Sequence, residues 1–376
     1  MTSGLRVALV CNLKVNVSVG VDAPPDALAE YDSLETVAAL QEALLAWGHE
    51  VVLLEADETL VDTVRRTAPD ICFNIAEGLR GDARESQVPA LLEMLGIPYT
   101  GSKVLAQAVS LDKGMAKHVW RDAGLPTPPF QVVRQTDERL DAALTFPLFV
   151  KPVHEGTGMG INDRSIVDGE SRLRQQIRWV IQTYRQPALV EGYLPGREFT
   201  VGLIGNARLS GEGRRHGLYD ERGFHLFPVL EIDAAVGAGR GVYNTASKSY
   251  DPGEDGAPRY LCPADIPATL EGELKRLTVA AFEAVGALDV GRVDFRLGRD
   301  GQPYLLEINT LPGLNPRVSD LCIMAQAEGF EYSDLINEIL DLALDRYAEE
   351  RGSDGRTAEL FQRWVVTAVA PAWKGF

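Results

Sequence analysis

The chain has 376 residues, with 37 basic against 54 acidic side chains and a net charge of −17. This length suggests two or three domains. The hydrophobic fraction of 45% and the charged fraction of 24% are typical of a globular protein. The acidic balance argues against nucleic acid as the main partner, although a local basic pocket for nucleotide phosphates remains compatible with it. No apolar run is long enough to span a membrane.

The cysteines and the N-terminal segment indicate the cellular location of the protein. The N-terminal run LRVALVC is too short for the apolar part of a signal peptide and predicts a first strand. The four cysteines are isolated, which favours free thiols in a reducing cytoplasm. The five histidines show no metal-ligand spacing, so zinc is not expected. We therefore expect a cytoplasmic protein.

The first part of the chain alternates strands and helices. This order predicts a doubly wound parallel sheet, in which ligands bind at the loops after the carboxyl ends of the strands. Those loops cover residues 12–35 and 77–85. The expected strands are residues 5–11, 50–56 and 70–76, and the expected helices are residues 33–47, 58–67 and 88–95.

A second unit begins near residue 113. A long segment with many glycines and prolines, residues 206–267, is either functional or contains short strands. The expected helices are residues 113–123, 169–183, 266–285 and 332–349, the expected strands are residues 147–152, 188–194 and 196–205, and residues 357–376 predict one more helix.

Two alternating runs, VGRVDFRL and PYLLEIN, flank an Asp-Gly turn at Asp300 and Gly301 and predict a β-hairpin. Side chains alternate faces along a strand. A two-residue turn would place Asp294 opposite Glu307. The four polar residues that would share one face are Arg292, Asp294, Glu307 and Asn309, with Val293, Phe295, Leu306 and Ile308 on the other face.

Two alternatives for this turn remain open. Moving it back by one residue pairs Arg292 with Glu307 and still keeps the four polar side chains together, whereas a three-residue loop would separate them. Carboxylate and amide oxygens on strands suit Mg²⁺. A neighbouring arginine suits charge that develops on a phosphoryl or acyl group. The competing interpretation is a hairpin with a solvated polar face.

Lys151 ends an apolar strand and is followed by Gly156, Gly158 and Gly160. Glycines let the backbone approach phosphate oxygens, and a lysine supplies charge. The spacing matches neither common nucleotide-binding fingerprint, and a flexible surface hairpin is the alternative. Taken singly, Lys113 and Lys248 are compatible with ordinary solvated lysines.

The order of these motifs resembles the ATP-grasp superfamily, and within it the D-alanine–D-alanine ligases. The series starts at Lys113 and continues with VKPVHEGTGMG, VEGYLPGREFTV, GRVDFRL and LLEINTLPGLNP. The resemblance covers about residues 5–345. It is strong over residues 113–315 and extends to FNIAEG, GIPYTGS and LDK in the first part of the chain.

The resemblance implies an α/β fold, α+β in its ATP-grasp part. The N-terminal doubly wound parallel sheet would occupy residues 1–112. The two-domain ATP-grasp fold would follow, with a lid domain at residues 113–204, a catalytic domain at 205–350 and a helical extension at 351–376. Dimers are common among such ligases, so a homodimer is one expected assembly.

The resemblance also implies roles for individual residues, with ATP and Mg²⁺ (or Mn²⁺) as cofactors. Arg292 would stabilise the acyl phosphate and the tetrahedral species, and Gly313 would offer a backbone donor. Glu35 lies near the place where the family binds the first substrate's ammonium group, and Lys248 matches a lysine of a mobile loop that closes the site. The other matches are Lys113 and Lys151 for phosphate, Glu155, Gly156, Thr157 and Gly158 for the flap over it, Glu191, Tyr193 and Leu194 for adenine, Glu198 for ribose, and Asp294, Glu307 and Asn309 for the metal.

The implied activity is ATP-dependent ligation of a carboxylate to an amine through an acyl phosphate, with small-molecule amino acids as substrates and neither nucleic acid nor membrane as partner. The departures from the family fall on the substrate side. Glu77 stands where the family has His, Thr157-Gly158 where it has paired serines, and Asn315-Pro316 where it has Thr-Ser. A ligase for another amino acid or a specialised metabolite is therefore an alternative, and a nucleotide-binding module without turnover is a lower-ranked one.

Overall fold

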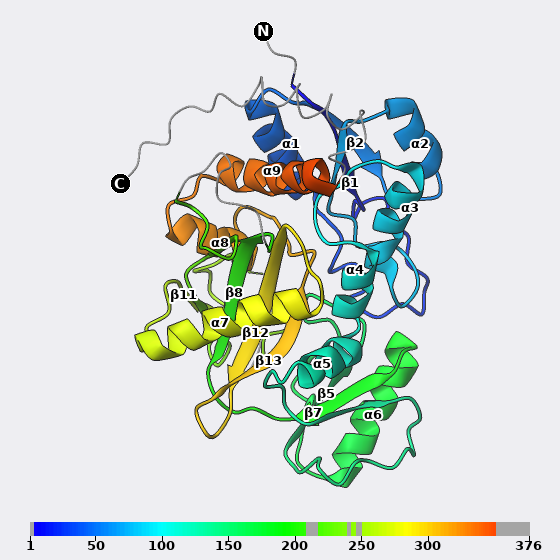
Figure 1. Ribbon diagram of the computed structural model, residues 1–376. Coiled ribbons are helices and arrows are strands. Elements are labelled where there is room, and N and C mark those ends of the chain that lie inside the picture. The colour runs from blue at the N-terminus through cyan, green and yellow to red at the C-terminus, as the bar shows by residue number, and fades with distance from the viewer. Residues whose placement is uncertain (1–3, 208–216, 239–241, 246–249, 351–376) are drawn as a thin grey trace.

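The computed structural model describes residues 4–207, 217–238, 242–245 and 250–350. It contains a three-stranded, a four-stranded and a six-stranded sheet (Figure 1). Lys248 and the predicted helix at residues 357–376 lie outside the described residues. The expected α/β fold with an N-terminal parallel sheet is confirmed, and the two sheets that follow are antiparallel.

The N-terminal unit is a parallel sheet with the strand order β2-β1-β3. The central strand is apolar almost throughout because the sheet buries it on both faces. Ser33 starts the first helix by accepting a hydrogen bond from the Thr36 amide, and Gly96 at φ +68° ends the third. The elements are β1 (Arg6–Cys11), α1 (Leu34–Ala46), β2 (Glu50–Glu55), α2 (Leu60–Thr67), β3 (Ile71–Asn74), η1 (Arg84–Ser86), α3 (Gln87–Leu95) and α4 (Val104–Leu111).

The four-stranded sheet has the order β4-β7-β5-β6 and is covered by α6. This helix buries Leu173, Ile177 and Val180, whose spacing puts them on one face. Burial of such a side chain contributes roughly 1.5–3 kcal/mol. The elements are α5 (Lys113–Asp122), β4 (Phe130–Val133), β5 (Leu148–Pro152), β6 (Ile166–Val167), α6 (Glu170–Tyr184) and β7 (Ala188–Gly192).

The six-stranded sheet has the order β11-β10-β8-β12-β13, and β9 pairs with β8. Residues 206–267 contain the short strands β9, β10 and β11, which was one of the two alternatives for this segment. The strand β8 belongs to this sheet, although residues 113–204 were expected to form one unit; the domain boundaries stay predictions. The elements are β8 (Glu198–Gly205), β9 (Phe224–Leu226), β10 (Leu230–Asp233), β11 (Arg259–Leu261), α7 (Ala268–Ala284), β12 (Val290–Leu297), β13 (Pro303–Asn309), α8 (Asp320–Ala327) and α9 (Tyr332–Glu350).

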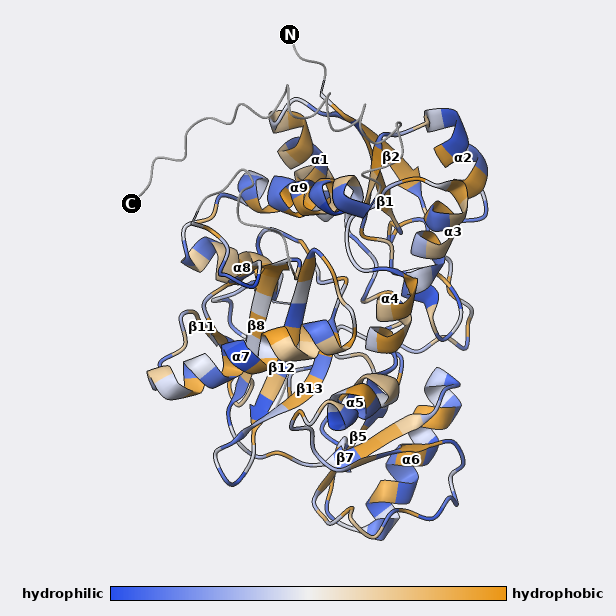
Figure 2. Ribbon diagram, viewed as in Figure 1, coloured by the Kyte–Doolittle hydropathy of each residue, from blue (hydrophilic) through white to orange (hydrophobic). Residues whose placement is uncertain are grey.

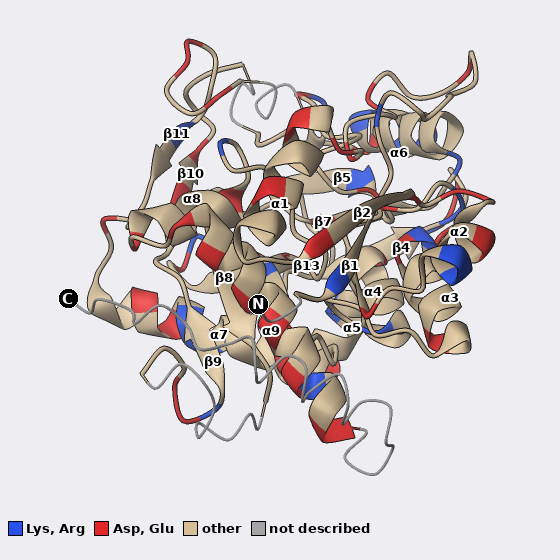
Figure 3. Cartoon of the chain, turned by 90° about the horizontal axis from the view of Figure 1, so that it is seen from above, with Lys and Arg blue, Asp and Glu red and all other residues tan. Residues whose placement is uncertain are grey.

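One apolar core joins the N-terminal sheet to the six-stranded sheet. Leu9, Leu40, Leu321 and Ile339 are buried in the same cluster. Figure 2 shows apolar strands inside and helices that alternate between apolar and polar segments, and Figure 3 shows acidic side chains recurring along α9. None of the described helices has both the length and the apolar character that a membrane crossing requires.

Two short helices, α4 and α8, were not predicted. Each has eight residues. The helix α2 is equally short but was predicted, because its buried Leu60 and Val64 are spaced four apart on one face. The sequences of α4 and α8 have apolar residues on several sides, so no helical period stands out.

Candidate active site

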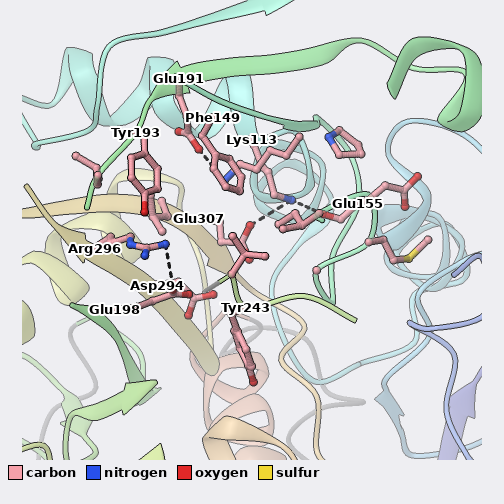
Figure 4. Close-up of a pocket in the computed structure, with 18 of the residues that line it drawn as sticks. Lys113, Phe149, Glu155, Glu191, Tyr193, Glu198, Tyr243, Asp294, Arg296 and Glu307 are labelled. Atoms are coloured by element: carbon pink, nitrogen blue, oxygen red, sulfur yellow. Dashed lines mark hydrogen bonds and ion pairs between the residues drawn. The ribbon is translucent and has the colours of Figure 1, made fainter. Parts of the chain in front are cut away.

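The hairpin of β12 and β13 brings the four predicted polar residues together. Arg292 lies opposite Asn309, and Asp294 lies opposite Glu307. The predicted face is therefore confirmed. Figure 4 shows Asp294 and Glu307 from this hairpin at one cavity.

The turn itself differs from the prediction. Gly298 donates its amide to the Gln302 carbonyl at 2.9 Å, which leaves a three-residue loop between them. Such a loop alone would rotate the polar residues apart, but a bulge compensates. Phe295 pairs with Leu305, so Leu306 is the extra residue. Leu305 is consequently the buried residue, and the prediction that Leu306 shares the face of Val293, Phe295 and Ile308 is wrong, since Leu306 lines the cavity.

Arg292 is held by two carboxylates. Its Nε and Nη2 donate to the two oxygens of Asp294, each at 2.9 Å, and its Nη1 lies 3.3 Å from Asp320 Oδ2. Burial opposes the charge, but Asp294 and Asp320 raise the pKa of Arg292 well above its usual value. Arg292 is thus a fixed cation. No sequence pattern pointed to Asp320, which is buried at the start of α8.

Lys113 links the glycine-rich loop to the hairpin. It is the first residue of α5, after the capping residue Asp112, whose side chain accepts from the Met115 amide at 2.9 Å. Lys113 Nζ donates to the Glu155 carbonyl and lies 3.4 Å from Glu307 Oε2. The ammonium group therefore stands between the loop and the hairpin carboxylates.

Glu191 binds two lysines. Lys151 Nζ and Lys117 Nζ each lie 2.9 Å from one of its oxygens. Burial works against the carboxylate, yet the two lysines lower the pKa of Glu191 below its usual value. Burial lowers the pKa of Lys117 to about 8. Lys117 was not predicted as a site residue, because a lysine in an amphipathic helix resembles an ordinary surface residue.

A cavity of about 70 Å³, here named the first cavity, lies between the two antiparallel sheets. Glu198 lies 3.4 Å from Arg296, whose guanidinium stands 5.4 Å from the Tyr193 ring centre (Figure 4). The predicted site residues that line the first cavity are Lys113, Lys151, Glu155, Gly158, Glu191, Tyr193, Leu194, Glu198, Asp294 and Glu307.

A larger cavity of about 400 Å³, here named the second cavity, adjoins the first. Lys113 and Glu307 line both. Among the predicted site residues, the second cavity is also lined by Gly156, Thr157, Arg292, Asn309 and Gly313.

Glu35 does not belong to this group. Its side chain is 54% exposed on α1 and lies 2.9 Å from Arg317. Two other acidic residues of the same segment, Glu30 and Asp32, line the second cavity instead. Helical spacing turns Glu35 outward, while the loop before α1 carries its side chains inward.

The hairpin fits a divalent cation. Asp294 and Glu307 are direct neighbours across the two strands, and Asn309 donates to Asp294 through its amide nitrogen at 3.2 Å, which leaves the amide oxygen available. Mg²⁺ commonly binds through one or two carboxylates together with substrate phosphates, and Mn²⁺ accepts the same oxygen donors. The donor set therefore suits a metal–nucleotide complex.

The fold and these cavities define an ATP-grasp enzyme. The family model described as D-ala D-ala ligase C-terminus matches residues 119–341. Two solved structures of D-alanine–D-alanine ligase from Bacillus anthracis share the fold, with TM-scores of 0.66 (complexed with ATP) and 0.67. Their identities are 22% and 24%, and each alignment covers 92% of this chain and 100% of the other.

Curated relatives agree. Uncharacterized protein y4sG of Sinorhizobium fredii is 37% identical, over 91% of this chain and 98% of its own length. D-alanine–D-alanine ligases of Pelotomaculum thermopropionicum and Syntrophotalea carbinolica are 31% and 34% identical, over 83% and 82% of this chain and 92% and 90% of theirs. The chain belongs to the D-alanine–D-alanine ligase family of ATP-grasp ligases.

Proposed function

We propose that this protein joins the carboxylate of an amino acid to an amine, using ATP and passing through an acyl phosphate. ATP binds in the first cavity and the two substrates bind in the second. The observation that carries the proposal is the junction between them: Lys113 and Glu307 line both cavities, and Arg292 lies beside this junction. Named relatives make D-alanine the first substrate to test.

Cationic and anionic side chains bind different parts of the nucleotide. Lys151 and Lys113 bind phosphate oxygens, and the backbone of the glycine-rich loop covers them. Tyr193, Leu194 and the backbone at Glu191 contact adenine, while Glu198 binds ribose. When bound at Asp294, Glu307 and Asn309, Mg²⁺ neutralises charge on the phosphoryl group during transfer.

The substrates react on the Arg292 side of the junction. The substrate carboxylate attacks the γ-phosphate and gives ADP and the acyl phosphate. The amine then attacks the acyl carbon, and phosphate leaves. Arg292 stabilises the negative oxygen, helped by the Gly313 amide. Removing one such donor typically lowers the rate by about 10²–10³-fold. Lys248, which lies outside the described residues, is still predicted to belong to a mobile loop that closes the site.

The walls of the second cavity favour a second candidate, a ligase for an amino acid other than D-alanine. Glu77 and Asn315, two of the departures from the family pattern, line this cavity. Asn315 donates to Thr36 Oγ1 at 2.9 Å, so its side chain ties the cavity wall to α1. A cytoplasmic location and a homodimer remain our predictions for this enzyme.

The test is ADP release with Mg-ATP in the presence of single D- and L-amino acids and of pairs, with product masses read from the same wells. D-alanyl-D-alanine from D-alanine alone would support the first candidate. Turnover only with other substrates would support the second. ATP binding without ADP release under any condition, including pairs, would contradict ligation and leave a nucleotide-binding module.

A further inference from the structure

We infer that the second cavity contains a subsite for an additional positive charge, so that one substrate carries a cationic group besides its α-ammonium. A basic amino acid or a diamine has this chemistry. The inference rests on the proposed function and names the substrate class of the same site. The subsite is formed by Glu30, Asp32, Glu77 and Glu85, which all line the second cavity.

Three of the four carboxylates of the subsite have no cationic partner in the described ranges. Arg84 Nη2 lies 2.5 Å from Glu30 and 3.0 Å from Glu155. The carboxylates of Asp32, Glu77 and Glu85 make no hydrogen bond or ion pair within the described part of the chain. Of the cations that line this cavity, Lys113 and Arg292 pair with Glu307 and Asp294, and Lys14 is exposed. Arg84 and Lys113 lower the pKa of Glu85, but burial and Glu30 have the larger effects. All three residues are partly exposed, and a partly desolvated carboxylate without a partner is costly to keep ionised; a cationic ligand would remove that cost.

The pKa values of these carboxylates are raised, as expected for carboxylates without cationic partners. Burial raises the pKa of Asp32 to about 7. Burial, with Glu30 next in importance, raises the pKa of Glu85 to about 8, and burial together with Glu85 raises the pKa of Glu77 well above its usual value. A bound cation favours the ionised forms and would lower all three.

A second feature of the cavity is independent of the carboxylates. Ser110 on α4 lines the second cavity and is only 4% exposed. Its Oγ has no hydrogen-bond partner among the residues that the structure describes. Buried hydroxyls nearly always have a partner, so this oxygen indicates that a polar ligand group belongs here.

The arrangement suits an organic cation rather than a metal ion. Among the described residues, no three His, Cys, Asp or Glu side chains are close enough to share a metal ion. The carboxylates come instead from separate elements: the loop before α1, the loop after β3, and η1. An extended ligand with two separated charges can meet carboxylates that are spread along a wall.

The second cavity differs from the pattern of the D-alanine–D-alanine ligases. Glu77 occupies the position where the D-alanine–D-alanine ligases carry His. A single α-ammonium needs about one carboxylate, whereas three carboxylates that line this cavity, those of Asp32, Glu77 and Glu85, have no ion-pair partner in the described part of the chain. The additional charge therefore distinguishes this chain from a site shaped for D-alanine.

The experiment compares matched substrates. ADP release is measured with Mg-ATP for D- and L-ornithine against D- and L-norvaline, and for putrescine against butylamine as the amine partner of alanine. The basic member of at least one pair should have a kcat/KM about tenfold higher or more, since hydrogen bonds to charged groups contribute roughly 1.5–3 kcal/mol. Equal or better turnover of every neutral member would overturn the inference while leaving the ligase function intact.

Variants test the residues. Glu77→Gln and Glu85→Gln should reduce the preference for the basic substrate about tenfold, through its KM, while KM for ATP stays the same. Glu271→Gln, at an exposed helical pair with Lys275, is the control. A thermal shift produced by ornithine or putrescine gives a readout that needs no turnover. The shift should shrink in both cavity variants, and no shift in the wild-type protein would refute the subsite even if ligation also fails.

Discussion

The glycine-rich loop is fastened to the N-terminal unit, and breaking one fastening should weaken ATP use. Asp26 accepts a hydrogen bond from the Gly160 amide at 2.9 Å and from the Tyr184 hydroxyl at 2.8 Å. Glu30 accepts from the Gly156 amide in the same way. The position of the glycine-rich loop thus depends on two carboxylates from residues 12–32.

We predict that Asp26→Asn lowers kcat/KM for ATP about 30-fold. The variant keeps the shape of the side chain but loses its charge. Hydrogen bonds to a charged group contribute about 1.5–3 kcal/mol, and neutral ones about 0.5–1.5 kcal/mol. Replacing two of the former by two of the latter weakens loop closure by about 2 kcal/mol, which corresponds to roughly 30-fold.

The assay combines steady-state kinetics with amide hydrogen exchange of the glycine-rich loop. Asp26→Asn should speed exchange at Gly160 and raise the ratio of ADP to ligated product, because a looser loop admits water to the acyl phosphate. Asp22→Asn is the control, since this carboxylate is 82% exposed and lies 4.0 Å from Arg185. Kinetics and exchange that match this control would refute the reasoning.

Three further predictions concern the site. Asp320→Asn should lower kcat about tenfold with little change in KM for ATP, because Arg292 loses one of its two carboxylates; an unchanged kcat would contradict this role. Gly160→Ala should destabilise the loop, since φ is +72° and a Cβ would stand 2.4 Å from Pro152 Cγ, and limited proteolysis should detect this. Asp32 has a pKa that folding raises from 3.8 to about 7, so its contribution to stability is present at low pH and is lost as the pH rises through this window. The free energy of unfolding of the wild-type protein should therefore fall relative to Asp32→Asn between these pH values in urea titrations, and a rising difference would be the wrong sign.

Local patterns predicted the elements well, because strands and helices that bury one face repeat with a fixed period. The strand at residues 5–11 and the helix after Ser33 follow from this periodicity and from capping chemistry. The shared face of Arg292, Asp294, Glu307 and Asn309 was predicted for a partly wrong reason. The three-residue loop and the bulge each shift the pairing of the two strands, and the two shifts cancel. Neither feature can be recognised from a sequence such as PYLLEIN.

Residues that act through distant partners could not be predicted. Lys117 is buried only because β7 brings Glu191 to it, and Asp320 meets Arg292 only after α8 packs on the large sheet. Similarly, Glu35 resembled a ligand residue by its place in the sequence, whereas the path of the loop before α1 turns Glu30 and Asp32 toward the cavity. Such contacts form only when distant elements pack together. They leave no periodic pattern of apolar residues in the sequence, so they could not be predicted from it.

The transfer of ¹⁸O from the substrate carboxylate to phosphate tests the central claim most directly. An amino acid labelled in both carboxylate oxygens is turned over with Mg-ATP, and the released phosphate is analysed by mass. The acyl-phosphate route predicts ADP and one ¹⁸O atom in each phosphate, because the carboxylate oxygen that attacked the γ-phosphate leaves with it. Unlabelled phosphate, or AMP and pyrophosphate in place of ADP, would contradict the mechanism assigned to Lys113, Glu307 and Arg292.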